Sequence, residues 1–268
     1  MILPNWNAPK QVKAFSSTRH GGFSQGAYQG LNLGMHVGDD PVLVLRNRQS
    51  LVATSAMPSS PIWLNQTHST VVLDVDAPTE QVLDADGLIT STPNVVCSAM
   101  TADCLPVLMT NRTGTQVAAV HAGWRGLVNG IVEHTAARMS GDVMVWLGPA
   151  IGAQAFEVGE DVFAAFVAHH PQAEYAFTPR AQQGKWLADM SQLVKLRLQE
   201  LGIEQVFDSG LCTYQDAERF YSYRRDGVTG RKPLLFGLKS KPSSIPISNN
   251  KKVSSTSLEN LVRDNHLS

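Results

Sequence analysis

Between residues 71 and 148 the chain repeats one pattern, in which short apolar runs alternate with glycine, proline or polar breaks. Apolar runs of this length, bounded by turn residues, are typical of buried β-strands. Pro106 lies inside one of them and indicates an edge strand or a bend, because proline cannot donate a hydrogen bond to a neighbouring strand. The predicted strands cover residues 71–75, 95–100, 105–110, 116–123 and 143–148.

Helical periodicity is present within residues 71–148 and again after them. Residues 128–139 place their apolar side chains three or four residues apart, which predicts one amphipathic helix. Residues 160–170 and an apolar stripe from Met190 to Leu201, closed by Gly202, predict two more, and 205–210 predicts a last strand. Several consecutive strands mixed with helices predict an α/β (α+β) fold with a mixed sheet. No linker interrupts residues 1–231, so we expect a single domain there.

The last 37 residues differ in composition. Residues 232–268 hold eight serines and three prolines without a sustained period, so we expect a catalytic domain at 1–231 and a flexible, atypical tail at 232–268. The whole chain carries a formal charge of −1, which gives no electrostatic reason to expect nucleic acid as a partner. No run is apolar enough to predict a membrane span or a signal peptide. Three cysteines cannot all pair as disulfides, and a cytoplasmic location is the expectation.

Three side chains with metal-binding or nucleophilic chemistry fall where predicted strands end: His68, Cys104 and His121. Two imidazoles and a thiolate can hold Zn²⁺ and leave a fourth position open. A nucleophilic thiolate paired with a histidine base is a second interpretation. The spacings of 36 and 17 residues match no compact ligand motif, so the residues alone also allow three unrelated side chains.

Glycine- and arginine-rich segments are the other candidates for binding. AGWRG at 122–126 opens the predicted helix and carries Arg125, and residues 220–231 hold Arg224, Arg225 and Arg231 among three aromatic residues. Such arginines can bind an anion, or they can simply lie in water. No segment fits GxGxxG or GxxxxGK[ST], which argues against nucleotide-binding folds of those two types.

Taken together, several motifs resemble one family, the YfiH/YlmD-type laccase-domain proteins. The resemblance covers about residues 12–231 and includes Thr18-Arg19 with Gly21-Gly22. Its motifs are NQTH at 65–68, DADG at 84–87, TADCLP at 101–106, HAGWRG at 121–126, GPAIG at 148–152 and the run at 220–231.

The resemblance implies a single α/β domain with mixed β-sheets between helix layers, and metal ligands at His68, Cys104 and His121. Members are described as purine nucleoside phosphorylases that cleave adenosine, inosine and related nucleosides with phosphate, as adenosine deaminases, and in an older description as copper-dependent polyphenol oxidases. The expected cofactor is Zn²⁺, with Cu²⁺ as an alternative, and the expected partners are a purine nucleoside and phosphate.

Roles within such a site follow from the chemistry. The three ligands are the expected catalytic residues, together with Asp103, which like Asp86 can shuttle protons, although both aspartates also suit turns. The expected phosphate-binding residues are Arg19, Arg125 and Arg225.

The alternatives are ranked by what they require. The resemblance makes a metal-dependent purine nucleoside phosphorylase with adenosine deaminase activity the expected function. Laccase chemistry needs many histidine ligands beyond one His₂Cys set, so polyphenol oxidation ranks second. A non-catalytic binding module ranks third. Family members normally end in a closing strand, and we expect Lys232-Pro233 to replace it here and to leave a sheet edge exposed.

Overall fold

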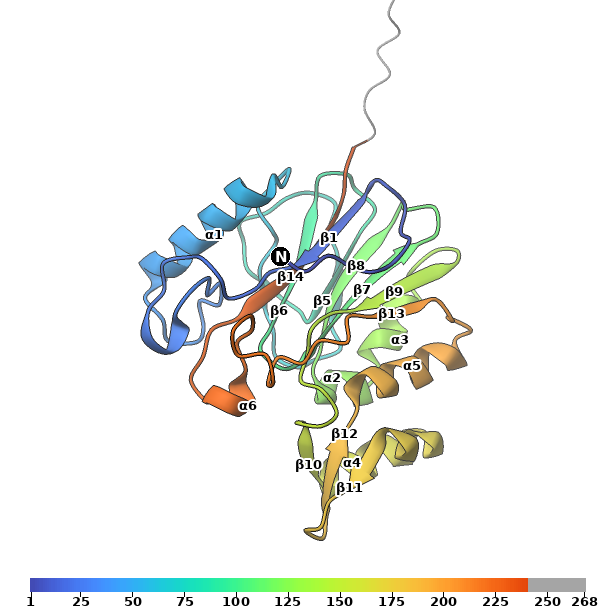
Figure 1. The fold of residues 1–268 in the computed structure, drawn as a ribbon. Coiled ribbons are helices and arrows are strands. Elements are labelled where there is room, and N and C mark those ends of the chain that lie inside the picture. The colour runs from blue at the N-terminus through green and yellow to red at the C-terminus, as the bar shows by residue number, and fades with distance from the viewer. Residues whose placement is uncertain (241–268) are drawn as a thin grey trace, which may run out of the picture.

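The computed structural model describes residues 1–240, and these form four stacked layers (Figure 1). Two β-sheets pack face to face, and helices cover the outer face of each. The predicted tail at 232–268 therefore lies mostly outside the described residues, apart from residues 232–240. The predicted α/β class, with mixed sheets between helix layers, is confirmed.

The larger sheet has six strands and mixes parallel with antiparallel pairs. Its outer pairs, β13 with β9 and β3 with β5, are parallel, and the central pairs are antiparallel. Each predicted strand from 71–75, 105–110, 116–123, 143–148 and 205–210 is present. The strand order is β13 (Val206–Asp208), β9 (Val143–Leu147), β7 (Leu105–Asn111), β8 (Val117–Ala122), β5 (Gly87–Thr90) and β3 (Val72–Asp74).

The smaller sheet has the order β1 (Val12–Ser16), β14 (Lys232–Leu238) and β6 (Val96–Thr101), all antiparallel. Alternate residues of β14 face opposite sides, as the period of a strand requires. Leu234 and Phe236 join the core between the two sheets, whereas Leu235 joins the core beneath α1 (Pro41–Ser55). The side chain of Leu51 anchors α1 in that outer core.

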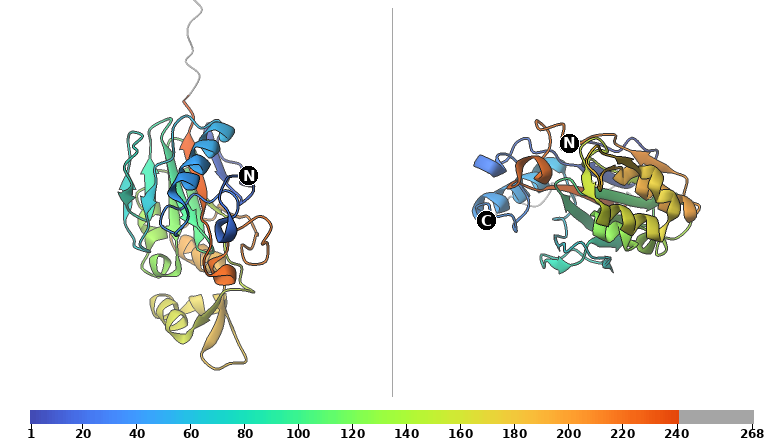
Figure 2. Two further views of the ribbon diagram at one scale, coloured as in Figure 1. Left: turned by 90° about the vertical axis from the view of Figure 1, so that its left-hand side faces the viewer. Right: turned by 90° about the horizontal axis from the view of Figure 1, so that it is seen from below.

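Helices α2 (Trp124–Val128), α3 (Ile131–Ala136) and α5 (Met190–Glu200) cover the opposite face of the six-stranded sheet, and α4 (Glu160–His169) packs against α2. A small sheet of β10 (Glu157–Gly159), β12 (Lys185–Ala188) and β11 (Phe177–Pro179) projects with α4 from the lower end of the molecule (Figure 2). The remaining elements are short: β2 (Leu64–Asn65), β4 (Leu83–Asp84), α6 (Tyr223–Asp226) and two 3₁₀ turns, Gly26–Tyr28 and Pro171–Ala176.

The single helix predicted over 128–139 is wrong in its continuity. The chain forms two short helices, α2 and α3, that are separated at Asn129 and Gly130. Gly130 has a φ of 91°, which a right-handed helix cannot contain and which glycine adopts without a steric penalty. The predicted apolar stripe is nevertheless buried, because both helices turn it toward the sheet.

Two expectations about prolines also differ from the structure. Pro106 lies in β7, an interior strand, but it is the second residue, where a missing N–H removes little of the ladder. Lys232-Pro233 does not interrupt a closing strand, because β14 runs through both residues and joins β1 to β6. The fold therefore extends beyond the expected boundary at 231, since three apolar residues from 234 to 236 fill two cores at once.

Within residues 1–240, every helix is too short or too polar to span a lipid bilayer.

Candidate metal centre

The three predicted ligands come from different elements and meet at one end of the sheets. His68 follows β2 in a loop, Cys104 lies between β6 and β7, and His121 is in β8. Because β7 and β8 are antiparallel, the start of β7 lies beside the end of β8, and Pro106 pairs with His121. This register brings Cys104 next to the imidazole of His121.

The ligand atoms of His68, Cys104 and His121 all lie within 4.8 Å of one another. His68 Nε2 is 3.7 Å from Cys104 Sγ, and the two imidazole rings meet edge to face with their centroids 4.8 Å apart. His121 is buried, Cys104 is half-buried and His68 is exposed.

This arrangement fits a single metal ion. Zinc–nitrogen and zinc–sulfur bonds of roughly 2.0–2.3 Å place tetrahedral ligands roughly 3.3–3.8 Å apart, so one ion reaches all three atoms after small side-chain movements. Two imidazoles and one thiolate suit Zn²⁺ and also Cu²⁺. Three protein ligands leave one coordination position for a water or a substrate atom.

Gly123 permits the close approach of these ligands. A Cβ atom at this position would lie 2.5 Å from His68 Cδ2 and 3.4 Å from Cys104 Sγ. Gly123 is also the residue at which α2 begins, in an extended conformation that other residues can adopt. The position therefore requires glycine for space and not for its backbone angles.

Asp86 holds two of the ligands in place from behind. Its buried carboxylate accepts a 2.7 Å hydrogen bond from His121 Nδ1 and further hydrogen bonds from the backbone N–H groups of Thr67, His68 and Ser69. Ser69 Oγ donates to it as well. The bond to Nδ1 leaves Nε2 of His121 as the atom free to coordinate a metal, which is the usual arrangement for a metal-binding histidine.

Two residues of the site have left-handed backbone conformations. His68 has a φ of 61° and Asp103 a φ of 93°, values that non-glycine residues adopt at an energetic cost. Strained residues of this kind concentrate at functional sites, where the surrounding structure enforces them. Here the carboxylate of Asp86 holds the backbone N–H of His68.

The electrostatics of the centre favour a charged thiolate and a charged imidazole. Burial opposes the ionisation of Cys104, but His121 and His68 outweigh it and lower its pKa to about 6. Burial likewise opposes a charge on His121, yet Cys104 and Asp86 raise its pKa to about 9. Burial of Asp86 is outweighed by hydrogen bonds from His121 and Ser69, and its pKa is lowered to about 2. A thiolate is the form of cysteine that binds metals.

Asp103 lies beside the ligands, but its carboxylate is fully engaged elsewhere. It accepts hydrogen bonds from Thr213 Oγ1 at 2.7 Å, from Ser222 Oγ at 3.0 Å and from the backbone N–H of Arg224 at 2.7 Å. These bonds tie the Cys104 loop to the two loops before α6. Asp103 therefore positions these loops.

The three predicted phosphate-binding arginines do not converge. Arg19 stacks on Tyr221 and lines an open hollow of about 890 Å³ formed by its own glycine-rich loop. Arg125 is exposed beside Trp124. Arg225 donates to the carbonyl groups of residues 213, 214 and 220 and to the carboxylate of Asp226, so its guanidinium holds a loop.

A small, mainly apolar cavity of about 140 Å³ borders the thiol of Cys104. The sequence analysis did not identify its walls, because they come from five separate segments of the chain. The aromatic and aliphatic side chains that line it are Trp124, Ile151, Phe156, Met190 and Tyr223. Such a slot beside a metal centre suits a flat, apolar ring.

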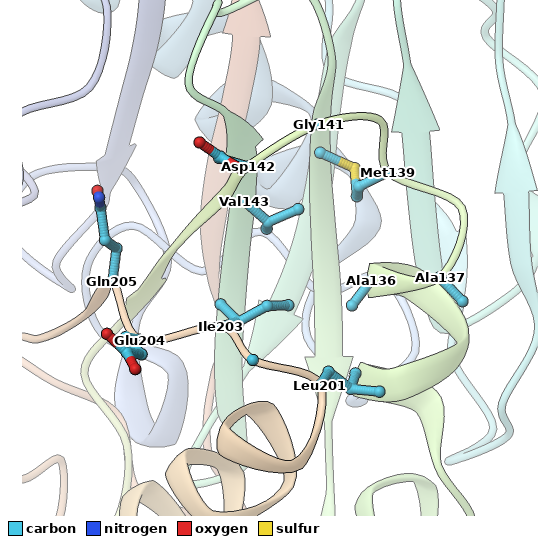
Figure 3. A pocket seen from close by; sticks show the side chains of 11 residues that line it. Ala136, Ala137, Met139, Gly141, Asp142, Val143, Leu201, Ile203, Glu204 and Gln205 are labelled. Atoms are coloured by element: carbon cyan, nitrogen blue, oxygen red, sulfur yellow. The ribbon is translucent and has the colours of Figure 1, made fainter.

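Another hollow, of about 420 Å³, lies between the ends of α3 and α5 and the start of β9 (Figure 3). Met139, Val143 and Ile203 form part of its wall, and Asp142 and Glu204 lie at its margin. None of the metal ligands lines it.

Comparison with known proteins identifies relatives of this architecture. The sequence model of a family described as "Multi-copper polyphenol oxidoreductase laccase" matches residues 13–239. A purine nucleoside phosphorylase of Haemophilus influenzae is 48% identical over 234 residues, which cover 86% of this chain and 96% of that protein. Purine nucleoside phosphorylase YfiH of Escherichia coli is 48% identical with the same two coverages.

Solved structures agree with this result. The crystal structure of Neisseria meningitidis protein NMB0706 superimposes with a TM-score of 0.85 at 47% identity, covering 89% of this chain and 99% of that one. YlmD from Geobacillus stearothermophilus superimposes with a TM-score of 0.79 at 28% identity, covering 86% and 93%.

Proposed function

Because the chain belongs to the laccase-domain family that includes these phosphorylases, we propose that it is a metal-dependent purine nucleoside phosphorylase. The observation that carries the proposal is the group of His68, Cys104 and His121 at the edge of an apolar cavity. The relatives named as purine nucleoside phosphorylases, which align over 86% of the chain, support the same conclusion.

Phosphorolysis exchanges one bond to the sugar for another. An oxygen of phosphate forms a bond to C1′ while the bond between C1′ and the purine nitrogen breaks, and the electron pair leaves with the base. A proton taken from phosphate or water then completes the free purine. The barrier falls when protein groups orient the two substrates and stabilise the charge on the leaving base.

The residues of the site divide this work. Trp124, Phe156 and Ile151 form walls against which a purine ring packs. His68, Cys104 and His121 would hold the metal, and Asp86 fixes His121 in the tautomer that coordinates. A bound Zn²⁺ supplies Lewis-acid stabilisation of a negative oxygen or nitrogen. Asp103 keeps Cys104 in place through the loops that it ties together.

The decisive experiment incubates the purified protein with inosine or adenosine, with and without phosphate. We expect the free base and ribose 1-phosphate to form only with phosphate, and about one zinc per chain by elemental analysis. Cys104→Ala is expected to lose both the zinc and the turnover, and Cys97→Ala, which changes a thiol buried between the sheets, serves as the matched control. No phosphate-dependent product from the zinc-loaded protein would refute the proposal.

Adenosine deamination is a second candidate for the same site, because a water in the open coordination position can be activated. Zinc deaminases also use a carboxylate as general acid and base. In the described part of the chain, Asp86 and Asp103 already accept hydrogen bonds with both carboxylate oxygens. Phosphorolysis therefore ranks first. Appearance of inosine from adenosine without phosphate would reverse this order.

Copper-dependent phenol oxidation is the activity in the family's description. A laccase needs a group of three coppers in addition to a His₂Cys site. Within residues 1–240, His68, Cys104 and His121 form the one cluster of His, Cys, Asp or Glu side chains close enough to hold an ion. Oxidation would therefore have to proceed at one metal, and a large rise in phenol oxidation on copper loading would favour it.

A further inference from the structure

Two arginines, Arg48 and Arg231, contact the segment formed by residues 32–34. Arg48, on α1, donates from Nε and Nη2 to the carbonyl oxygen of Leu33, at 3.0 and 2.8 Å. The backbone N–H of Leu33 in turn donates to the carbonyl oxygen of Arg231 at 3.1 Å. The two arginines, 183 residues apart in sequence, are thus fixed to opposite sides of one residue.

The side chain of Arg231 packs directly against this segment. A Cβ at Gly34 would lie 2.8 Å from Arg231 Cγ, so glycine leaves the space that the arginine occupies. The backbone N–H of Arg231 donates to Asn32 Oδ1, which fixes the start of its side chain. Only Nη1 of its guanidinium has recorded partners in residues 1–240, the carbonyl oxygens of Thr229 and Gly230.

This group of charges adjoins the metal ligands. Arg231 lies close enough to Cys104 for the two charges to interact, and His36 lies within electrostatic reach of Arg231, Arg48 and His121. His36 remains accessible to solvent, and burial together with the nearby arginines lowers the pKa of its imidazole, so it offers a neutral hydrogen-bonding group near pH 7. These residues therefore border the centre and not a remote surface.

The negative charges of Cys104 and Asp103 act on Arg231 without direct contact with its guanidinium. No ion pair within the described residues includes Arg48 or Arg231, whereas Arg138, Arg197 and Arg219 each pair with a carboxylate. Asp103, the acidic group nearest to Arg231, already accepts three hydrogen bonds from other donors. An anion that binds between the two guanidinium groups would gain favourable charge interactions with both.

We propose that His36, Arg48 and Arg231 form an oxyanion subsite that binds inorganic phosphate beside the metal centre. Guanidinium groups bind phosphate oxygens through charge-assisted hydrogen bonds, and within residues 1–240 Nη1 of Arg48 and Nε and Nη2 of Arg231 have no hydrogen-bond acceptor. The apolar cavity also borders Cys104, and the ring centroid of its lining residue Tyr223 lies 6.0 Å from the guanidinium carbon of Arg231, so the base and the phosphate would lie next to each other. The role of the bound anion as a substrate rests on the proposed function. The binding of the anion does not depend on it.

Steady-state kinetics with varied phosphate and varied inosine test the subsite. Arg231→Gln is expected to raise KM for phosphate about tenfold or more, while KM for inosine and the zinc content change less than about twofold. His36→Asn is expected to raise KM for phosphate severalfold. His36→Asn is the second variant, and Arg48 is left unchanged. Arg48 also holds the carbonyl oxygen of Leu33, so replacing Arg48 can disturb folding. Arg46→Gln is the matched control, since Arg46 lies on the same helix, is exposed and stacks on Phe23.

A binding measurement separates this inference from the proposed function. Inorganic phosphate is expected to raise the melting temperature of the zinc-loaded wild type and of Arg46→Gln, and to have little effect on Arg231→Gln. An active enzyme whose variants keep the wild-type KM for phosphate and the same thermal shift would overturn the subsite and leave the phosphorylase proposal standing. A wild type that is stabilised by phosphate through Arg231, but never cleaves a nucleoside, would refute the phosphorylase and retain the subsite.

Discussion

At the scale of single residues, Asp86 supports the centre without touching the metal. Asp86→Asn keeps the shape of the side chain but replaces one acceptor oxygen by a donor, so some N–H groups of residues 67–69 lose their partner. We expect zinc affinity to fall by roughly 10- to 100-fold and the free energy of unfolding to fall by about 1–3 kcal/mol. Competition with a zinc chelator and urea denaturation measure the two effects.

The matched control is Asp84→Asn. Asp84 is exposed, and its side chain accepts a hydrogen bond from Asn65, away from the ligands. This variant is expected to retain wild-type zinc affinity. If both substitutions weakened zinc equally, the hydrogen bond from His121 to Asp86 would not be the cause.

Gly123 gives a second test at this scale. In Gly123→Ala the new methyl group would meet His68 Cδ2 at 2.5 Å, so His68 must move away from Cys104. We expect zinc affinity to fall at least about tenfold, with far-ultraviolet circular dichroism unchanged, because the backbone angles of residue 123 suit alanine. The measurement is zinc content after dialysis against a chelator.

Gly159→Ala is the comparison for this effect. Gly159 also precedes a helix in an extended conformation, and a Cβ there meets chiefly the end of the mobile Asp161 side chain. Normal zinc retention in Gly123→Ala would contradict this prediction, because it would show that a methyl group at residue 123 does not displace His68.

The sequence predicted some residues of the site and not others. The ends of predicted strands selected His68, Cys104 and His121, and the resemblance joined them into one ligand set. Asp86 was identified as a candidate, but its bond to His121 could not be foreseen, because it depends on the pairing of β5 with β8. The arginines were harder still, since an isolated sequence does not show which guanidinium groups already have carbonyl partners.

At the scale of elements, β14 decides where the fold ends. It lies between β1 and β6, so its removal would leave both strands of the smaller sheet without a partner and would open two cores. We expect a chain ending at Arg231 to be insoluble or unfolded. A chain ending at Ser240 should keep the wild-type melting temperature within about 2 °C and its zinc content. Thermal unfolding of the purified chains tests both statements, and a folded chain ending at Arg231 would contradict the role of β14.

Periodicity predicted elements well where one face or one run is apolar throughout. It found five strands of the larger sheet, β6, α4 and α5, all of which pack apolar side chains into a core. It missed α1, whose buried residues are few, although Asp40 and Pro41 together carry the signal of a helix start. The break at Gly130 escaped notice because an apolar stripe does not reveal a single left-handed residue.

At the scale of the whole molecule, the layers explain why the site lies where it does. The two sheets share a core, and the loop between β6 and β7 and the loop that leaves β8 meet at one end of it. The α1 side contributes Arg48, the helical side contributes Trp124, and β14 follows Arg231 directly. The proposed site therefore draws on residues from all four layers, so we expect it to require the complete fold.

Lys232 connects this site to the stability of the whole fold. Its side chain is fully buried, and Nζ donates to Thr101 Oγ1 at 3.2 Å and to the carbonyl oxygen of Pro149 at 2.9 Å. Burial lowers its pKa to about 7, although Asp103 opposes the shift. The unfolded chain binds this proton up to about pH 10.5, so between about pH 7 and 10.5 the unfolded state holds more protons. The free energy of unfolding should therefore rise with pH across that window. Below about pH 7 the folded protein should bear the full cost of burying the charged amine of Lys232.

Lys232→Met removes that cost while filling the same space. We expect the free energy of unfolding at pH 7 to rise by roughly 1–4 kcal/mol, less whatever the lost hydrogen bond to Pro149 contributes. Its increase between pH 7 and pH 10 should become smaller than in the wild type, because the group that titrates in this window is gone. Lys239→Met, one residue beyond the same strand and exposed, should leave both quantities unchanged. Urea denaturation at several pH values provides the comparison, and a less stable Lys232→Met at pH 7 would show that the two hydrogen bonds outweigh the cost of burying the amine.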